Sequence, residues 1–171
     1  MNFSVRTATQ NDVAEMHKMM VELAIFEEAL DEVFATEQDL HRVLFGSASN
    51  SGDNTNQNSI VSAHVVDGPD GLAAMAIWFL TYSTWQGRYG IYLEDLYVRP
   101  AFRGQGIGTS LLNKLAQVCQ ENDYTRFQWS VLDWNVKAIE VYRSVGAEPI
   151  EGWTGYRLTG EPLKALAQSK E

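Results

Sequence analysis

The sequence predicts a domain of the mixed α/β (α+β) class. Runs rich in β-branched and aromatic residues, typical of strands, occupy residues 60–66, 72–82 and 89–98. Apolar residues at helical spacing fill other segments, above all residues 107–119. Because a chain of 171 residues can enclose a core of its own, we expect one domain spanning residues 1–171.

The N-terminal part predicts one short strand and two helices. Residues 3–6 alternate as a strand. Thr9 is followed three residues later by Asp12, a capping-box pattern that marks the start of a helix. Thr36 and Asp39 repeat the pattern, so we expect a second, shorter helix after them.

The rest of the chain predicts a loop and three further elements. Residues 46–59 are polar and of low complexity, and we expect them to form a mobile loop. Residues 126–132 predict a strand, residues 135–145 a helix and residues 153–158 a last strand. A terminal helix should begin near Pro162, because proline is tolerated in the first turn.

Composition limits the function. The formal net charge of −9 argues against a nucleic-acid partner and suits a cationic one, although a charged surface without a function explains it equally well. No apolar run is long enough to span a membrane. With Cys119 as the single cysteine, no disulfide framework can form, so we expect a reducing, cytoplasmic location. His17, His41 and His64 are scattered, and no metal site is expected.

The most informative stretch is a glycine loop that joins the strand at residues 89–98 to the helix after it. The loop contains Arg103, Gly104, Gly106 and Gly108. The first N–H groups of a helix are unpaired and positively polarised, and glycine lets an anion approach the backbone closely. The stretch therefore predicts a phosphate-binding loop, or else a purely structural turn.

Two common phosphate-binding motifs do not fit this loop. A Walker loop needs a lysine before its serine or threonine, whereas Gly108 precedes Thr109. A dinucleotide fingerprint needs a third glycine where Thr109 stands and an acid at the end of the next strand, but Asp123 precedes that strand. The remaining pattern, Arg103-x-x-Gly106-x-Gly108, resembles the pyrophosphate loop of the GNAT acyl-CoA N-acetyltransferases.

A later stretch carries the same resemblance. Four residues match a GNAT motif in which a strand splays from its neighbour and a helix follows: Asn135, Ala138, Tyr142 and Gly146. Within the family, residues 82–88 and 131–135 resemble the thialysine enzymes of the diamine (spermidine/spermine) and thialysine acetyltransferase branch. The resemblance implies one mixed, mostly antiparallel sheet with helices on both faces, and a homodimer.

The resemblance also implies acetyl-CoA as the cosubstrate. The end of the central strand, the glycine loop and the start of the later helix would hold it, with Leu96 and Val98 offering backbone groups to the pantetheine arm as one strand does to another. The residues so implied are Leu96, Tyr97, Val98, Arg103, Gly104, Gln105, Gly106, Ile107, Gly108, Thr109, Asn135 and Ala138.

Acetyl transfer to an amine requires a base and an acid. An alkylamine with a pKa near ~10.4 arrives as an ammonium ion, and the departing thiol has a pKa near ~8.5. We expect Glu94 to be the base, directly or through water, and Asp95 to help bind the amine. Adjacent strand residues face opposite sides unless a bulge, usual in the family here, re-aims one. The plain alternative pairs these acids with Arg88 or Arg99.

Tyr142 is the general acid that the resemblance implies, because in the family this hydroxyl reaches the departing sulfur; the alternative is a core tyrosine. Phe26, Glu27, Trp85 and Tyr156, together with both acids, are expected to bind the amine, the aromatic rings by cation–π contact. Phe26 and Tyr156 stand where diamine enzymes have a tyrosine and a tryptophan, so one hydroxyl contact is lost.

The resemblance and this chemistry together predict an acetyl-CoA-dependent N-acetyltransferase. Its acceptor would be a primary amine of a small cationic substrate such as thialysine, a diamine or a polyamine, with Glu94 as base and Tyr142 as acid. Two other functions stay open, a protein acetyltransferase acting on a lysine or an N-terminus, and a non-catalytic acyl-CoA-binding regulator. No nucleic acid and no membrane is expected as a partner.

Overall fold

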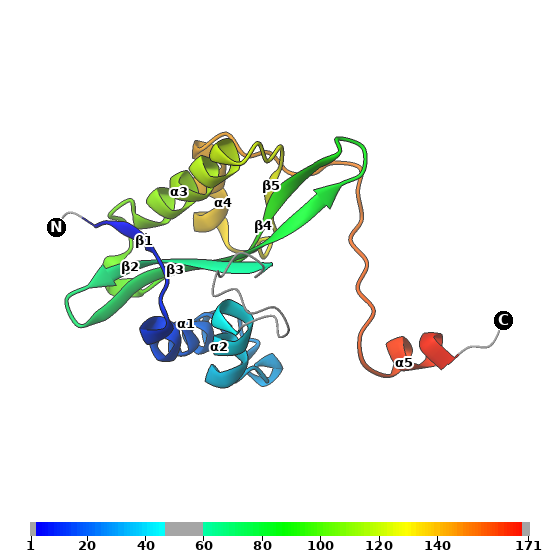
Figure 1. The fold of residues 1–171 in the computed structure, drawn as a ribbon, viewed down its shortest axis with the longest axis horizontal. Helices are drawn as coiled ribbons and strands as arrows, with labels where there is room; N and C mark the ends of the chain where they lie inside the picture. The colour runs from blue at the N-terminus through cyan, green and yellow to red at the C-terminus, as the bar shows by residue number, and fades with distance from the viewer. Residues whose placement is uncertain (1–2, 47–59, 169–171) are drawn as a thin grey trace, which may run out of the picture.

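The computed structural model describes residues 3–46 and 60–168 and contains one five-stranded sheet (Figure 1). The loop predicted at residues 46–59 lies, apart from its first residue, outside the described residues. The strands lie side by side in chain order: β1 (Val5–Thr7), β2 (Val61–Gly68), β3 (Gly71–Ser83), β4 (Arg88–Val98) and β5 (Phe127–Trp129). Neighbours are antiparallel except β4 and β5, which are parallel, and this confirms the mixed, mostly antiparallel sheet.

Helices cover both faces of the sheet, as predicted (Figure 1). One face carries α1 (Val13–Phe26) and α2 (Glu37–Phe45), and the other carries α3 (Ile107–Glu121) and α4 (Val136–Ser144). A fifth helix, α5 (Gly160–Gln168), stands apart at the end of an extended segment. Short 3-10 turns occur at Gln10–Asp12, Leu30–Glu32 and Pro100–Phe102.

The two predicted capping boxes are present. The Asp39 carboxylate accepts a hydrogen bond from the Thr36 N–H (3.0 Å), and the Asp39 N–H donates to the Thr36 hydroxyl (3.2 Å). The Asp12 carboxylate accepts from the Thr9 N–H (2.7 Å) and from Arg6 (2.7 Å). The Arg6 hydrogen bonds lower the pKa of Asp12 to about 2. Both polar clusters fix where α1 and α2 begin.

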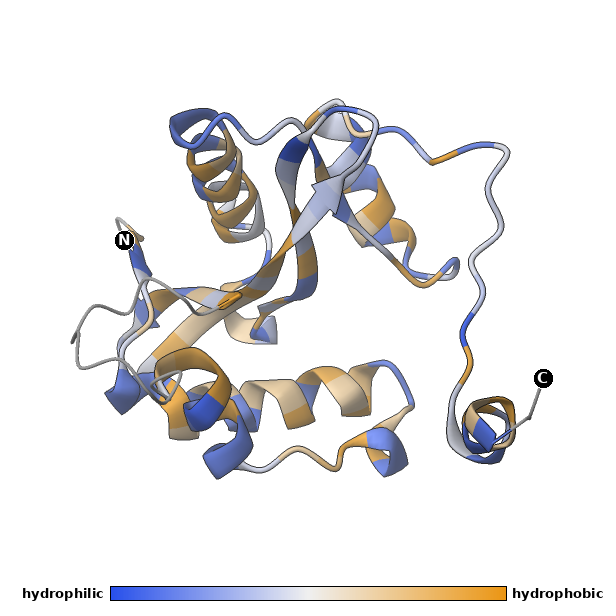
Figure 2. Cartoon of the chain, turned by 45° about the vertical axis from the view of Figure 1, so that its right-hand side comes forward, coloured by the Kyte–Doolittle hydropathy of each residue, from blue (hydrophilic) through white to orange (hydrophobic). Residues whose placement is uncertain are grey.

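The sheet separates two apolar clusters. Val65 and Val66 are neighbours in β2 and both are fully buried, yet they belong to different clusters because adjacent strand residues face opposite sides. Met16 of α1 packs in the first cluster and Leu111 of α3 in the second. The buried parts of the central strands are therefore apolar on both faces, and Figure 2 shows orange residues, interrupted by paler and blue ones, along these strands.

An irregularity in β4 positions the functional part of the molecule. Leu93 pairs with Trp78 and Asp95 pairs with Ile77, so Glu94 is an extra residue without a partner in β3. This is the bulge that the resemblance to the family implied. β5 pairs with β4 only at residues 91–93, so β4 beyond the bulge has β3 on one side and no described strand on the other.

The strand predicted at residues 153–158 is wrong. These residues are extended but belong to no strand, and every side chain from residue 148 to residue 168 is exposed. Strand propensity reflects how well a side chain fits a pleated, half-buried surface, and the described chain offers this segment no such surface. β5 is also shorter than predicted, since it ends at Trp129, where the chain turns away from β4 towards α4.

Candidate active site

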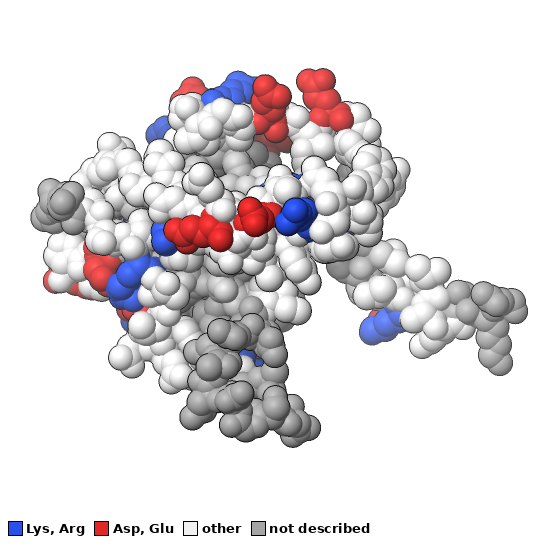
Figure 3. Space-filling view, turned by 45° about the horizontal axis from the view of Figure 1, so that its top comes forward, with Lys and Arg blue, Asp and Glu red and all other residues white. Residues whose placement is uncertain are grey.

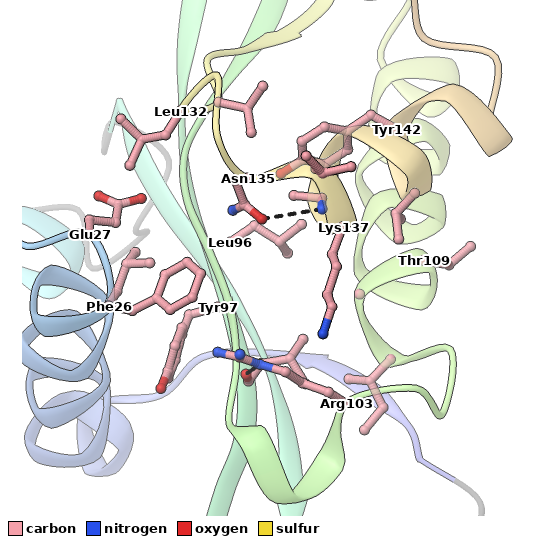
Figure 4. Close-up of a pocket in the computed structure, with 18 of the residues that line it drawn as sticks. Phe26, Glu27, Leu96, Tyr97, Arg103, Thr109, Leu132, Asn135, Lys137 and Tyr142 are labelled. Carbon is pink, nitrogen blue, oxygen red and sulfur yellow. Dashed lines mark hydrogen bonds between the residues drawn. The ribbon is translucent and has the colours of Figure 1, made fainter.

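A cavity of about 860 Å³ lies where β4 loses its neighbour. The end of α1, the outer half of β4, the glycine loop with the start of α3, and the segment leading into α4 enclose it (Figure 4). Every residue predicted to bind acetyl-CoA lines this cavity except Gln105, whose side-chain amide donates to the Ala101 carbonyl (3.4 Å). Segments far apart in the sequence thus form one cleft.

The glycine loop forms one end of the cleft. Gly104 and Gly106 have left-handed backbone angles (φ 75° and 78°), which side-chain-bearing residues rarely adopt. The Ser110 N–H donates to the Gly106 carbonyl (2.9 Å) and begins the helical bonding of α3. The N–H groups before it in the first turn are therefore left for a ligand, at the positive end of the helix dipole. This end suits a phosphate group.

Arg103 crosses the cleft from the glycine loop towards α1 (Figure 4). Its Nε donates to the Val98 carbonyl (2.8 Å), which leaves that oxygen one further lone pair for a ligand. The guanidinium lies over the rings of Phe26 (5.2 Å) and Tyr97 (5.6 Å). These contacts hold a positive charge on the floor of the cleft.

Lys137 also lines the cavity, and sequence reasoning missed it. It lies in the first turn of α4 between two residues that were predicted, Asn135 and Ala138. Figure 4 shows its side chain extending through the cleft in the direction of Arg103. A cation in the first turn of a helix is opposed by the helix dipole, so a lysine here was a signal for an anionic ligand. Other lining residues that were missed are apolar or small: Leu23, Phe102, Ser130, Val131, Leu132, Trp134, Val136 and Val141.

Acidic side chains gather at the opposite end of the cleft. Glu94, at the bulge, and Glu27, at the end of α1, line the cavity. Asp95 does not line it, but burial, together with the negative charges of Glu94 and Glu27, raises the pKa of Asp95 to about 6. Burial also raises the pKa of Glu27. Neighbouring carboxylates that raise the pKa of Asp95 form a place where a cation is favoured.

The structure does not support the alternative in which Arg99 pairs with Glu94 or Asp95. The Arg99 guanidinium forms ion pairs with Glu15 (3.0 Å) and Glu22 (2.9 Å) of α1. No ion pair joins Arg88 to Glu94 or Asp95 within the described residues. The acids at the bulge therefore remain available to a ligand.

Tyr142 of α4 joins the core and the cavity. Its ring packs against Trp129 (5.0 Å between centroids), while its hydroxyl points into the cleft (Figure 4). Burial, with a smaller contribution from the charge of Glu27, raises the pKa of Tyr142, so the hydroxyl stays protonated at neutral pH. The Asn135 side-chain oxygen accepts from the Ala138 N–H (3.3 Å) and caps the helix that carries this tyrosine.

Besides Asp95, two of the predicted amine-binding residues do not line the cavity. Trp85 lies in the turn between β3 and β4 and is 90% exposed. Tyr156 lies in the extended C-terminal segment and is 95% exposed. Phe26, in contrast, lines the cavity and packs on Trp134 (5.4 Å). Of the three aromatic side chains predicted to bind the amine, Phe26 therefore lies in the cleft, where it packs with Trp134.

Two kinds of feature do not occur in the part of the chain that the structure describes. Residues 3–46 and 60–168 contain no group of three or more histidine, cysteine, aspartate or glutamate side chains placed to hold a metal ion. Within the same residues, no helix has the length and apolar character that crossing a membrane requires.

Comparisons with known proteins agree with this geometry. A sequence model of the acetyltransferase (GNAT) family matches residues 24–147. A thialysine N-epsilon-acetyltransferase of Sus scrofa is 35% identical over 95% of this chain and 96% of that protein. An L-ornithine N5-acetyltransferase of Arabidopsis thaliana is 28% identical over 95% and 86% of the two chains. Among solved structures, an integron cassette protein from the mobile metagenome of V. cholerae is 25% identical, with a TM-score of 0.76 over 99% of each chain.

Proposed function

Because this chain belongs to the GNAT acetyltransferase family and is an N-acetyltransferase, we propose that its acceptor is the terminal primary amine of a small cationic compound such as thialysine, ornithine or a diamine. The observation that carries the proposal is the cluster of Glu27, Glu94 and Asp95 opposite the Tyr142 hydroxyl. The relatives named for thialysine and ornithine support it, because both compounds end in a primary amine.

Acetyl-CoA, which the family uses, fits the opposite end of the cleft. Its pyrophosphate would lie on the free N–H groups of the glycine loop at the start of α3, near Arg103. Lys137 would contact the same negative charges from α4. The acetyl end would then extend along the open edge of β4 towards the bulge.

The acidic cluster then binds and activates the amine. Carboxylates attract the ammonium ion, and Glu94, directly or through water, accepts its proton. The neutral amine attacks the thioester carbonyl, and the C–S bond breaks as the amide forms. Tyr142 donates its proton to the departing thiolate, and the second proton, which the attacking nitrogen loses as it becomes an amide, returns to Tyr142 directly or through water. Glu94 then releases its proton to water, and the products are the acetylated amine and CoA.

Overall charge supports the choice of a cationic acceptor. The formal net charge is −9, and Figure 3 shows acidic and basic side chains interspersed on the face it displays. A negative surface attracts a cation over long distances and raises its rate of encounter. The effect is general, so it favours small amines as a class and does not select one of them.

A panel of acceptors tests the proposal. Purified protein is supplied with acetyl-CoA and thialysine, ornithine, lysine, a diamine, spermidine or a lysine-containing peptide, and released thiol is measured. We expect the highest kcat/KM for a small amino acid or diamine, and much lower values for the peptide. As a matched control, Glu94→Gln should lower kcat/KM by about 10²-fold, the low end for a general base, and should leave acetyl-CoA affinity unchanged.

Each contrary result would indicate a different function. A preference for the peptide would make the chain a protein acetyltransferase. Tight acetyl-CoA binding without turnover of any amine would make it an acyl-CoA-binding regulator. If Glu94→Gln is as active as the parent across the pH range, the base lies elsewhere, and Asp95 and Glu27 are the next carboxyl groups to replace.

A further inference from the structure

A row of four side chains, which we call the Arg103 bridge, crosses the cleft. The Cζ atom of Arg103, from the glycine loop, lies 5.2 Å from the centre of the Phe26 ring and 5.6 Å from that of Tyr97. The Phe26 ring also packs on Trp134, with 5.4 Å between the ring centroids. Figure 4 shows Arg103, Tyr97 and Phe26 together between the glycine loop and α1. The bridge therefore touches all four parts of the chain that enclose the cavity.

Arg103 has room for a phosphate and for the rings at the same time. A guanidinium group is flat, so it donates hydrogen bonds along its edge and stacks on rings with its faces. Its Nε donates to the Val98 carbonyl (2.8 Å), while Nη1 and Nη2 form no hydrogen bond or ion pair with another of the described residues. The pyrophosphate proposed at the start of α3 can therefore bind these two nitrogens without displacing Phe26.

The two rings that Arg103 contacts are not held equally firmly. Tyr97 is 5% exposed and belongs to the apolar cluster between α1 and the sheet. Phe26 is 37% exposed and is the last residue of α1. Two residues later, Glu28 has a left-handed backbone angle (φ 59°), which is uncommon for a residue with a side chain. Phe26 therefore lies in the part of α1 that a ligand can most easily order.

Glu27, the neighbour of Phe26, belongs to the amine end of the cleft. It lines the cavity at the end of α1. Burial, with a smaller contribution from the charge of Glu27, raises the pKa of both Asp95 and Tyr142, so these three groups lie within electrostatic reach of one another. A shift of Phe26 moves Glu27 because one peptide bond joins the two residues. The Arg103 bridge thus connects the phosphate end of the cleft to the amine end.

We propose that the Arg103 bridge couples the two substrates: acetyl-CoA fixes Arg103, Arg103 fixes Phe26, and the ordered end of α1 then presents Glu27 to the amine. Phe26 is in this respect a positioning residue, which acts on the amine through Glu27. The coupling arises because the phosphate restricts the guanidinium, so its contact with the ring then costs less conformational entropy.

Coupling of this kind is reciprocal. If acetyl-CoA raises the affinity for the amine by some factor, the amine raises the affinity for acetyl-CoA by the same factor. We expect about fivefold in each direction, the size of one cation–π contact. The part that concerns the amine rests on the proposed function, whereas the ordering of α1 by the cofactor does not.

Hydrogen exchange measures the ordering of α1 without any amine. The Glu27 N–H donates to the Leu23 carbonyl (2.9 Å) and the Ala29 N–H to the Ala24 carbonyl (2.9 Å), so these two amides report on the end of the helix. The probe is CoA, which carries the same pyrophosphate and has no acetyl group to transfer. At saturating CoA, we expect exchange at both amides to slow about fivefold in the wild type.

Two substitutions remove the contact from opposite sides. Phe26→Leu keeps an apolar side chain but removes the ring, and Arg103→Lys keeps the charge but removes the flat face. Each should reduce the slowing to less than about twofold at saturating CoA, and the double variant should go no further, because both changes remove one contact. Phe26→Tyr retains the ring and should restore the response. Phe34→Leu is the matched control, since Phe34 is 85% exposed and does not line the cavity.

Calorimetry measures the effect on the amine, with the best acceptor of the amine panel. We expect saturating CoA to raise the affinity for that amine about fivefold in the wild type and in Phe34→Leu, and to leave it unchanged in Phe26→Leu. A ring that only contacted the amine would instead lower the affinity equally with and without CoA. In turnover, KM for the amine should rise about fivefold in Phe26→Leu while kcat changes by less than about twofold.

Four results overturn the proposal. The first is exchange at the end of α1 that CoA does not slow in the wild type. The second is slowing that persists in Phe26→Leu and Arg103→Lys, and the third is its loss in Phe34→Leu as well. The fourth is an amine affinity that is the same with and without CoA. If no amine of the panel is acetylated, the proposed function fails, whereas the exchange measurement still decides whether CoA orders α1 through Phe26.

Discussion

The two ends of the cleft are built in different ways. At the α3 end, backbone N–H groups form the site, and glycines at positions 104 and 106 keep side chains out of it. At the bulge end, the functional groups are side chains from α1, β4 and α4. The first end depends on the shape of the main chain over a few residues, whereas the second depends on the packing of the whole domain.

This difference indicates how each end should respond to substitution. A site made of backbone tolerates the loss of a nearby side chain but not the addition of one. A site made of side chains loses function when one polar atom is removed, even if the ring or chain that carried it remains. The predictions below test this contrast, beginning with the largest expected effect.

Tyr142→Phe removes one oxygen from the bulge end and keeps the ring that packs on Trp129. A proton benefits the thiolate only as the C–S bond breaks, so the loss belongs to the transition state. We expect kcat to fall by roughly 10² or more, the range for a lost general acid, with acetyl-CoA affinity little changed. The wild-type rate should fall at high pH as Tyr142 ionises above its ordinary pKa, and the variant should lose that alkaline fall.

Pre-steady-state kinetics must accompany those pH profiles, because slow product release can hide the chemical step. If the variant keeps its kcat while chemistry is rate-limiting, Tyr142 acts only in packing and water protonates the thiolate. A loss of acetyl-CoA affinity equal to the loss in kcat would also contradict the role, since it would indicate a ground-state contact.

Gly106→Asp adds a side chain to the backbone end. The position has φ 78°, which disfavours any side chain, and the new Cβ would face open space in the cleft rather than the protein. A carboxylate there would repel the pyrophosphate, and we expect acetyl-CoA affinity to fall by about 10²-fold. Calorimetry gives the affinity and circular dichroism the fold. Gly152→Asp is the matched control, since it has φ 76° but lies in the extended segment between α4 and α5, outside the cleft.

Unchanged acetyl-CoA binding in Gly106→Asp would rule out the glycine loop as the pyrophosphate site. A loss of fold in both aspartate variants would instead show that backbone strain at the left-handed position, and not the added charge, causes the loss of binding. Gly106→Ala then separates the two causes, because it adds the same backbone strain without the charge.

The same contrast explains what could be predicted from sequence. Arg103, Gly104 and Gly106 follow one another, so the chain itself places them together, and a short motif sufficed. The bulge at Glu94 was expected only because the family has one. Trp85 and Tyr156 were assigned to the cleft from their positions in the chain, but neither lines it, because the packing of distant segments decides where a side chain points.

The elements of the body were predictable for a related reason. Capping boxes at Thr9 and Thr36 and the apolar stripe of α3 are local signals, and each gave the correct helix. The strand at residues 153–158 was not correct, because a strand exists only beside another strand, and the sequence does not say which one. Lys137 was missed since it carries no motif of its own.

Asp95→Asn tests whether the bulge end sacrifices stability for function. The pKa of Asp95 rises from 3.8 to about 6 on folding. Below pH 3.8 the carboxyl group is neutral in both the unfolded and the folded protein, and the full stability is present. As the pH rises through 6, the buried group becomes charged and that stability is lost. At neutral pH, the buried charge therefore opposes folding. The isosteric amide should raise the free energy of unfolding by about 2 kcal/mol at neutral pH, measured by urea titration.

Activity should move in the opposite direction. If the charge helps to bind the amine, kcat/KM for the amine should fall about tenfold in Asp95→Asn. We also expect the wild-type kcat/KM to decline below about pH 6 as Asp95 is protonated, and we expect the variant to lack that decline. Thr36→Ala serves as a control for stability alone, since it removes a helix cap far from the cleft. A variant that is both less stable and fully active would make Asp95 a structural residue.

Lys137→Ala should have the smallest effect, because the backbone end does not depend on any single side chain. Lys137 has its charged group in the cleft, with no ion pair to another described residue, so it contributes a screened attraction to the cofactor's phosphates. We expect the KM for acetyl-CoA to rise about fivefold, with kcat unchanged, and the salt dependence of KM to weaken.

Lys137→Arg keeps the charge and should restore most of the affinity. Lys18→Ala removes the same charge from the outer surface of α1 and should change neither constant. A fall in kcat that Lys137→Arg does not rescue would contradict the contrast between the two ends, because it would show that a side chain of the backbone end acts in the chemical step.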